Sequence, residues 1–218
     1  MSLAPGVHDL ALTFDRGDRE LTIHPAAVET PRGIMLIDVG LDLETLRGGL
    51  AASGLELSDV TRVFLTHQDG DHVAALESVL DAQPATVYAH RRATPYITGE
   101  KAAIKGDRGY EPVSVDVEVV GDVRFRTAAG PMTVVETPGH SPGHVSLYFP
   151  QHALLLAADA LTAGPDGLAG PNPEFTPEMD EARRSVRRLA ECAIENVLCY
   201  HGGPVSASAA ELATISEN

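Results

Sequence analysis

The stretch Thr66-His67-Gln68-Asp69-Gly70-Asp71-His72 decides how this chain is interpreted. Within six residues it offers four side chains that can bind a metal ion, namely His67, Asp69, Asp71 and His72. The apolar segment 61–66 before it is typical of a β-strand, and the apolar spacing from Val73 to Leu80 predicts a helix after it. In an extended segment alternate residues project to one side, and the turn into a helix brings His72 beside them. The alternative is a polar loop that caps the helix and meets water.

Three further predicted strands end in side chains of the same kind. His140 lies in the Pro/Gly-rich turn from Thr137 to His144, which follows the predicted strand 132–136. Asp159 ends the apolar run 153–158, where an unpaired buried carboxylate would be costly. His201 ends the predicted strand 196–200. The joint occurrence of these residues predicts one shared metal site.

The pattern along the chain alternates between strands and helices. A buried strand is predicted over 33–40, followed by a helix that Asp42 caps and Gly54 ends. Alternating valines from Val113 to Val119, followed by Gly121-Asp122, predict a hairpin with 123–125. A further strand is predicted over 144–149, and helices over 176–193, opened by Thr176 and Pro177, and near 208–216. This order predicts an α/β sandwich of two sheets between helical layers, formed as a single domain by residues 1–218.

Composition and charge narrow the function. The 218 residues contain 16 Lys and Arg against 31 Asp and Glu, a net charge of −15 that disfavours binding to nucleic acid. The longest apolar run, 153–158, is far shorter than the roughly 20 residues that span a bilayer, so no membrane association is expected. The first twenty residues lack the pattern of a signal peptide, which favours a cytoplasmic location. The remaining partner class is a small-molecule substrate.

These motifs resemble the metallo-β-lactamase superfamily, whose His-x-His-x-Asp-His motif is followed by a His, a bridging Asp and a final His. The resemblance extends from about Leu36 to His201. It implies a four-layer αββα sandwich of two mixed β-sheets flanked by helices, with the site at one edge. It also implies two metal positions, the first held by His67, Asp69 and His140, the second by Asp71, His72 and His201, with Asp159 bridging them. Thr66, Asp38 and His144 are candidates for orienting the ligands through hydrogen bonds.

One residue departs from the family motif, because Asp69 stands where the family has its second histidine. With two divalent ions and a bridging hydroxide, the site then sums to a net charge of zero instead of +1, which weakens the acidification of bound water. Oxygen ligands also favour harder ions. We therefore expect two divalent metal ions, zinc in the first place, with manganese or iron as alternatives. A carboxylate at this position is also similar to the flavodiiron branch of the superfamily.

The resemblance implies a metal-dependent hydrolase that cleaves an ester, a lactone or a thioester with a metal-bridging hydroxide as nucleophile. Asp71 is the predicted catalytic residue, which would orient the hydroxide and shuttle its proton. The alternatives are an iron-dependent redox enzyme, either a dioxygenase or a diiron oxidase, and a non-catalytic metal-binding module. The patternless loop 98–112 is predicted to form a lid that faces the substrate, and its basic residues, such as Lys105 and Arg108, either attract an anionic substrate or are simply solvated. Spacing identifies no substrate-binding residue and no oligomeric state.

Overall fold

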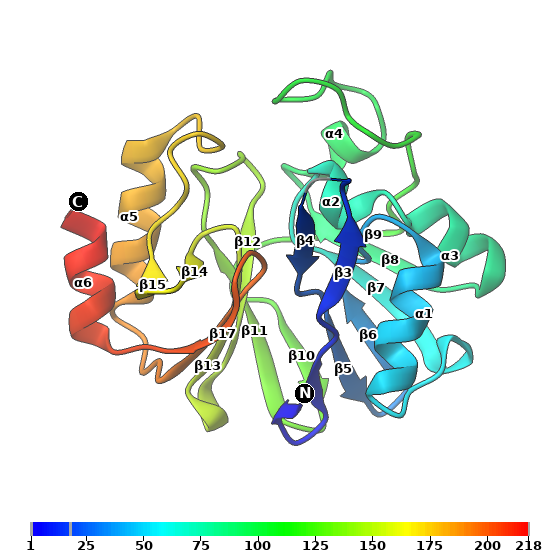
Figure 1. Ribbon diagram of the computed structural model, residues 1–218, viewed down its shortest axis with the longest axis horizontal. Coiled ribbons are helices and arrows are strands. Elements are labelled where there is room, and N and C mark those ends of the chain that lie inside the picture. The colour runs from blue at the N-terminus through cyan, green and yellow to red at the C-terminus, as the bar shows by residue number, and fades with distance from the viewer. Residues whose placement is uncertain (1, 18, 218) are drawn as a thin grey trace.

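Two mixed β-sheets packed face to face form the centre of the computed structural model, which describes residues 2–17 and 19–217 (Figure 1). The first sheet has the order β1-β2-β5-β6-β7-β8-β9, with strands β1 (Ser2–Ala4), β2 (Val7–Asp9), β5 (Ala26–Thr30), β6 (Gly33–Ile37), β7 (Val60–Leu65), β8 (Thr86–His90) and β9 (Val117–Val119). The second has the order β10-β11-β12-β13-β16-β17, with strands β10 (Arg124–Thr127), β11 (Gly130–Glu136), β12 (Val145–Phe149), β13 (Leu154–Ala158), β16 (Asn196–Cys199) and β17 (Gly203–Ser206).

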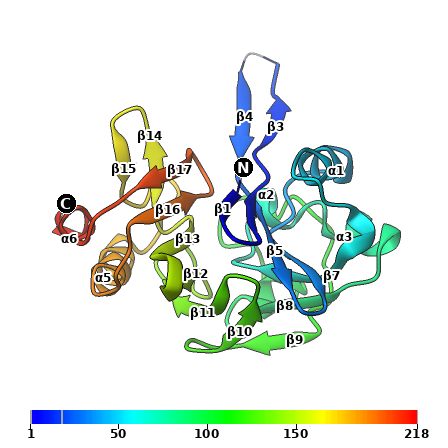
Figure 2. The ribbon, with the colours of Figure 1, turned by 90° about the horizontal axis from the view of Figure 1, so that it is seen from below.

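Helices cover the outer faces of both sheets. Their bounds are α1 (Leu43–Ala52), α2 (Gly70–Val73), α3 (Leu76–Ala82), α4 (Thr94–Ile97), α5 (Met179–Leu189) and α6 (Ala209–Glu217), with 3₁₀ turns at η1 (Leu57–Asp59) and η2 (Pro150–His152). Seen from two directions, α1 and α3 lie outside the first sheet, and α5 and α6 lie outside the second (Figures 1 and 2). Two small hairpins, β3 (Leu12–Asp15) with β4 (Glu20–Ile23) and β14 (Thr162–Gly164) with β15 (Gly167–Ala169), complete the fold. The predicted four-layer αββα sandwich is confirmed.

Successive side chains of a strand point to opposite faces of the sheet, so one strand can contribute side chains to two hydrophobic cores. On β7, Val63 and Leu65 are buried in the cluster beneath α1 and α3, whereas Phe64 is buried in the cluster between the two sheets. A third cluster, which includes Leu155 of β13 and Val186 of α5, fills the space between the second sheet and its helices. Both faces of each sheet are therefore covered, which accounts for the nearly continuous apolar sequences of the inner strands.

The predicted helix after β6 is confirmed as α1. Asp42 caps it by accepting a hydrogen bond from the backbone N–H of Thr45 at 2.8 Å. Gly54, with φ of +73°, ends the segment, and its N–H donates to the carbonyl of Ala51. The C-terminal helix α6 likewise begins directly after Ser208, whose Oγ accepts from the backbone N–H of Glu211 at 3.2 Å.

The predicted hairpin between 113–119 and 123–125 is wrong. β9 begins only at Val117 and pairs in parallel with β8, while β10 pairs with β11 in the other sheet. Gly121-Asp122 therefore carries the chain from one sheet to the other. Val113 and Val115 are partly buried against the first core without joining a strand, which explains their alternation.

Two helix predictions need correction in their bounds. The segment 73–80 is divided, because α2 ends at Val73 and α3 begins at Leu76. The helix expected over 176–193 is shorter, since α5 begins at Met179 after an N-cap Glu178 that forms no side-chain cap, and ends at Leu189. Within residues 2–17 and 19–217, no helix is long and apolar enough to cross a membrane.

Candidate metal centre

All seven predicted ligands lie at one edge of the sandwich, where strands of both sheets end. The first sheet supplies the turn after β7, and the second supplies the segments after β11, β13 and β16. Their donor atoms form three groups within which every pair lies within 4.8 Å: His67, Asp69 and His140; His67, His72 and Asp159; Asp71, His72 and His201. Their roles as ligands remain predictions, but the sequence correctly identified the residues that meet here.

The turn after β7 explains how adjacent motif residues face the same point. The carbonyl of Asp69 accepts from the N–H of His72 at 3.0 Å, which starts α2. The carbonyl of His72 in turn accepts from the N–H of Val39 at 3.0 Å, which fixes the turn to the end of β6. The rings of His67 and His72 thereby approach to 4.0 Å between centroids.

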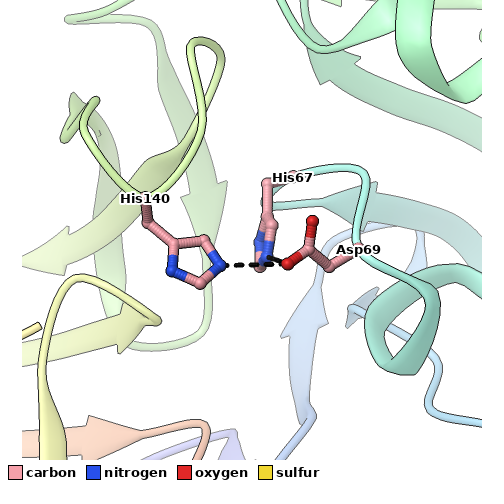
Figure 3. A group of neighbouring side chains, drawn as sticks. All are labelled: His67, Asp69 and His140. Carbon is pink, nitrogen blue, oxygen red and sulfur yellow. Dashed lines mark hydrogen bonds and ion pairs between the residues drawn. The ribbon is translucent and has the colours of Figure 1, made fainter. Parts of the chain in front are cut away.

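The first half-site consists of His67, Asp69 and His140 (Figure 3). Oδ2 of Asp69 lies 3.6 Å from Nε2 of His67 and 3.1 Å from Nε2 of His140. Figure 3 shows His140 approaching from the loop after β11, opposite the segment that carries the other two side chains.

The second half-site consists of Asp71, His72 and His201. Oδ2 of Asp71 lies 3.2 Å from Nε2 of His201 and 4.0 Å from Nε2 of His72. The side chain of Asp71 is 27% exposed and faces a cleft of about 550 Å³, which Asp69, Asp159 and His201 also line. This half-site is therefore accessible to a small molecule.

Asp159 lies between the two half-sites. Its Oδ2 is 3.3 Å from Nε2 of His140, 3.6 Å from that of His201 and 4.0 Å from that of His67. Its Oδ1 is 3.3 Å from Nε2 of His72. One carboxylate thus reaches the histidines of both half-sites, as a bridging ligand must.

The chemistry of these donors fits divalent cations. Among the described residues, Nε2 of His67, Nε2 of His72 and Oδ1 of Asp159 are buried without a hydrogen-bond partner. Such buried polar atoms are costly unless something binds them. Ligand atoms about 2.0–2.2 Å from a tetrahedral ion lie roughly 3.3–3.6 Å from one another. The N–O distances of 3.1 to 4.0 Å observed here bracket that spacing.

Carboxylates and imidazoles perturb one another strongly in this site. Burial opposes charge on His72, but Asp38 and then Asp159 raise its pKa well above the ordinary value. Burial likewise opposes charge on His201, yet the neighbouring carboxylates of Asp159 and Asp71 raise its pKa to about 9. Burial and then the neighbouring His72 lower the pKa of His67. Binding of a cation would replace the protons that the raised histidines hold, because ligating imidazole is neutral.

Asp38 and Thr66 contact the histidines of the motif, and their orienting role stays a prediction. The buried carboxylate of Asp38 accepts from Nδ1 of His72 at 2.9 Å and from the N–H and hydroxyl of Thr66 at 2.8 and 2.7 Å. Oγ1 of Thr66 also lies 3.1 Å from Nδ1 of His67. These contacts direct Nε2 of both rings toward the carboxylates. Asp38 adopts φ of +60°, a strained backbone conformation for a residue other than glycine.

His144 supports Asp159 from behind. Its Nε2 accepts from the backbone N–H of Asp159 at 3.1 Å, and its Nδ1 lies 2.8 Å from Oγ1 of Thr137. Burial, followed by the nearby His67, keeps the pKa of His144 well below its ordinary value, so the ring is neutral as this bond requires. His144 thus contacts the backbone of Asp159, and its orienting role stays a prediction.

Sequence reasoning missed three contacts around the centre. Tyr200 stacks on His72 with centroids 3.6 Å apart, and its hydroxyl donates to the carbonyl of Asp71 at 2.6 Å. The hydroxyl of Tyr110 donates to the carbonyl of Gln68 at 2.8 Å, which ties the loop 98–112 to the motif. Lys105 of that loop contacts the first half-site directly. Because this loop has no sequence pattern, nothing in the sequence indicated that its basic residue would make this contact.

Comparisons with known proteins agree with this fold. A profile of the metallo-beta-lactamase superfamily matches residues 23–201, so the chain belongs to this superfamily. It is 28% identical over 178 residues to the probable metallo-hydrolase YflN of Bacillus subtilis, a match that covers 66% of this chain and 65% of that protein. It is 35% identical over 104 residues to a hydroxyacylglutathione hydrolase of Rhizobium meliloti, which covers 48% of this chain and 35% of that protein. The chain is thus similar to proteins named as a metallo-hydrolase and as a hydroxyacylglutathione hydrolase.

Solved structures share the fold. The metallo-beta-lactamase family protein TTHA1429 from Thermus thermophilus superimposes with a TM-score of 0.77 at 23% identity, over 99% of this chain and 78% of that one. The matches to the two curated relatives cover less of those proteins. The chain spans 65% of the length of YflN and 35% of the length of the hydroxyacylglutathione hydrolase.

Proposed function

We propose that this protein is a metal-dependent hydrolase that cleaves an ester, a lactone or a thioester. The observation that carries the proposal is the position of Asp159, whose carboxylate reaches the histidines of both half-sites at the edge of an open cleft. The name of the Rhizobium meliloti relative, hydroxyacylglutathione hydrolase, favours a thioester among these substrates. We further propose that two divalent cations bind, zinc in the first place.

The side chains divide the work of this reaction. Cations held by the two half-sites would activate a water molecule and polarise the substrate carbonyl. The partly exposed carboxylate of Asp71 would orient that water and accept its proton at an Oδ atom. Asp159, with its backbone N–H fixed by His144, would keep the two half-sites at a constant separation. Asp38 and Thr66 would keep the imidazoles turned toward the cleft.

The first test is elemental analysis of the purified protein, combined with hydrolysis assays on a panel of thioesters, lactones and simple esters. We expect up to two zinc or manganese ions per chain, and hydrolysis that a chelator abolishes and added metal restores. Iron as the main metal in a coloured protein, with oxygen consumption and no hydrolysis, would contradict the proposal and favour the redox alternative that the carboxylate at position 69 suggests.

Asp69→His tests the effect of the unusual residue in the first half-site. Replacing the carboxylate by a neutral ring leaves the loaded site more positive, so the acidic limb of the pH profile of kcat/KM should move to lower pH. We also expect zinc to be preferred more strongly over manganese, because a nitrogen ligand replaces oxygen. Asp166→His, at an exposed position between β14 and β15, is the matched control. An unchanged profile would refute the charge argument.

A further inference from the structure

The ammonium group of Lys105 lies among the ligands of the first half-site. Its Nζ is 2.5 Å from Oδ2 of Asp69 and 2.7 Å from Nε2 of His140, and it also donates to the carbonyl of Phe175 at 3.0 Å. The lysine comes from the loop between α4 and β9 and lies 35 positions from His140 in the sequence. A positive charge of the chain itself thus contacts two of the three predicted ligands of the first cation.

A metal ion and this ammonium group exclude each other. Both would use Oδ2 of Asp69 and Nε2 of His140, and the two positive charges would repel at such a short distance. The second half-site differs, because no lysine or arginine in the described part of the chain forms an ion pair with Asp71 or Asp159. The two half-sites are therefore not equivalent toward an incoming cation.

The loop is held at both ends, on either side of Lys105. Before it, the backbone N–H of Lys101 donates to the carbonyl of Pro95 at 2.8 Å. After it, Nε of Arg108 donates to the carbonyl of Tyr96 at 3.1 Å, and the hydroxyl of Tyr110 donates to the carbonyl of Gln68. Gly70 allows this close packing, since a Cβ there would lie 2.9 Å from the carbonyl oxygen of Arg108. Between these anchors, Lys105 has a long flexible side chain that is 22% exposed and precedes Gly106, with φ of +53°.

We propose that Lys105 is a built-in competitor for the cation of the first half-site, so that the two half-sites load in sequence. The second half-site fills first, and the first fills only as Lys105 withdraws from Asp69 and His140. The inference rests on the proposed function in one respect, namely that both half-sites bind divalent cations. It adds that metal occupancy controls the position of the loop 98–112, which borders the site.

The experiment is a zinc titration of metal-stripped protein by calorimetry, with bound zinc counted by equilibrium dialysis. The wild type should bind a first equivalent tightly and a second more weakly. In Lys105→Ala, the second equivalent should bind at least about tenfold more tightly, which corresponds to roughly 1.4 kcal/mol. Lys101→Ala is the matched control, because it removes the same charge from the same loop at a residue that lies over the ring of Tyr96. Its second equivalent should bind as in the wild type.

Hydrogen exchange of the peptide 101–109 provides a second readout that does not depend on catalysis. In the wild type, exchange should increase only with the second equivalent of zinc, whereas in Lys105→Ala it should be high before any zinc is added. Equal second-step affinities in the wild type and Lys105→Ala, or equal tightening in Lys105→Ala and Lys101→Ala, would overturn the inference and leave the proposed function intact. If neither protein binds zinc or, in the same titration, manganese, the proposed function fails together with the inference.

Discussion

Asp159→Ala is expected to abolish hydrolysis and to remove one of the two cations. Its carboxylate lies within 4.0 Å of Nε2 of four histidines, two in each half-site. Without it, each half-site keeps fewer ligands. The surrounding histidines also lose the negative charge that offsets their own partial positive charge, so they repel one another. We expect kcat/KM to fall by at least about a thousandfold, or roughly 4 kcal/mol of transition-state stabilisation. Steady-state kinetics and metal analysis on the same preparation measure both effects.

Two further variants make this result specific to the bridge. Asp166→Ala removes an exposed carboxylate of the same region and should leave metal content and kcat/KM unchanged. Asp159→Asn keeps the shape of the side chain but not its charge, and should lose most of the activity with little change in folding. If Asp159→Ala retained both ions, the bridging role would be excluded.

Asp38→Ala is expected to destabilise the fold itself, even without metal. The buried Asp38 carboxylate satisfies the N–H and hydroxyl of Thr66 and Nδ1 of His72. Removing one partner from a buried charged network leaves the others unsatisfied, which costs about 3–5 kcal/mol. Urea denaturation of metal-stripped protein, followed by circular dichroism, measures this loss in the free energy of unfolding.

The matched control for this variant lies four residues further along the chain. Asp42→Ala removes an exposed helix cap and should cost only about 1 kcal/mol. Asp38→Asn retains one acceptor and should cost about 1–3 kcal/mol, and it remains informative if the alanine variant does not fold. Equal losses for Asp38→Ala and Asp42→Ala would show that the buried network contributes little.

The residues of the site could be predicted because they follow strands. A run such as Leu154 to Ala158 reads as a buried strand, and a carboxylate directly after it must lie at a sheet edge with a partner. The family resemblance then assigned partners that no spacing could supply, since His140 and His201 lie far from the motif in sequence. The orienting contacts of Asp38 and Thr66 were predictable for the same reason, because both follow the ends of neighbouring parallel strands.

The errors in the predicted fold arise where tertiary contacts override local pattern. Alternation at Val113 and Val115 was interpreted as a strand, but these residues alternate because one side of an irregular segment packs against the first core. A glycine followed by aspartate favours a tight turn, yet here it serves a crossing between sheets, and only the pairing of β9 with β8 distinguishes the two. The strands of the first thirty residues were not predicted, since polar residues interrupt each short apolar segment.

The contribution of Lys105 lies beyond sequence pattern for a different reason. Its loop has no periodicity, so nothing in the sequence specifies where the tip lies. Tyr110 and Gly70 position that loop through one hydroxyl contact and one close backbone approach. Such contacts depend on the assembled motif and become visible only in three dimensions.

The division of the site between the two sheets has a consequence for biosynthesis. The first 119 residues complete one sheet and carry only His67, Asp69, Asp71 and His72 of the predicted ligands. His140 and Asp159 follow with the second sheet, and His201 emerges last, after β16. A nascent chain on the ribosome therefore cannot assemble either complete half-site early. Each predicted half-site can form only after strands of the second sheet have docked against the first, and the second half-site needs β16 in place as well.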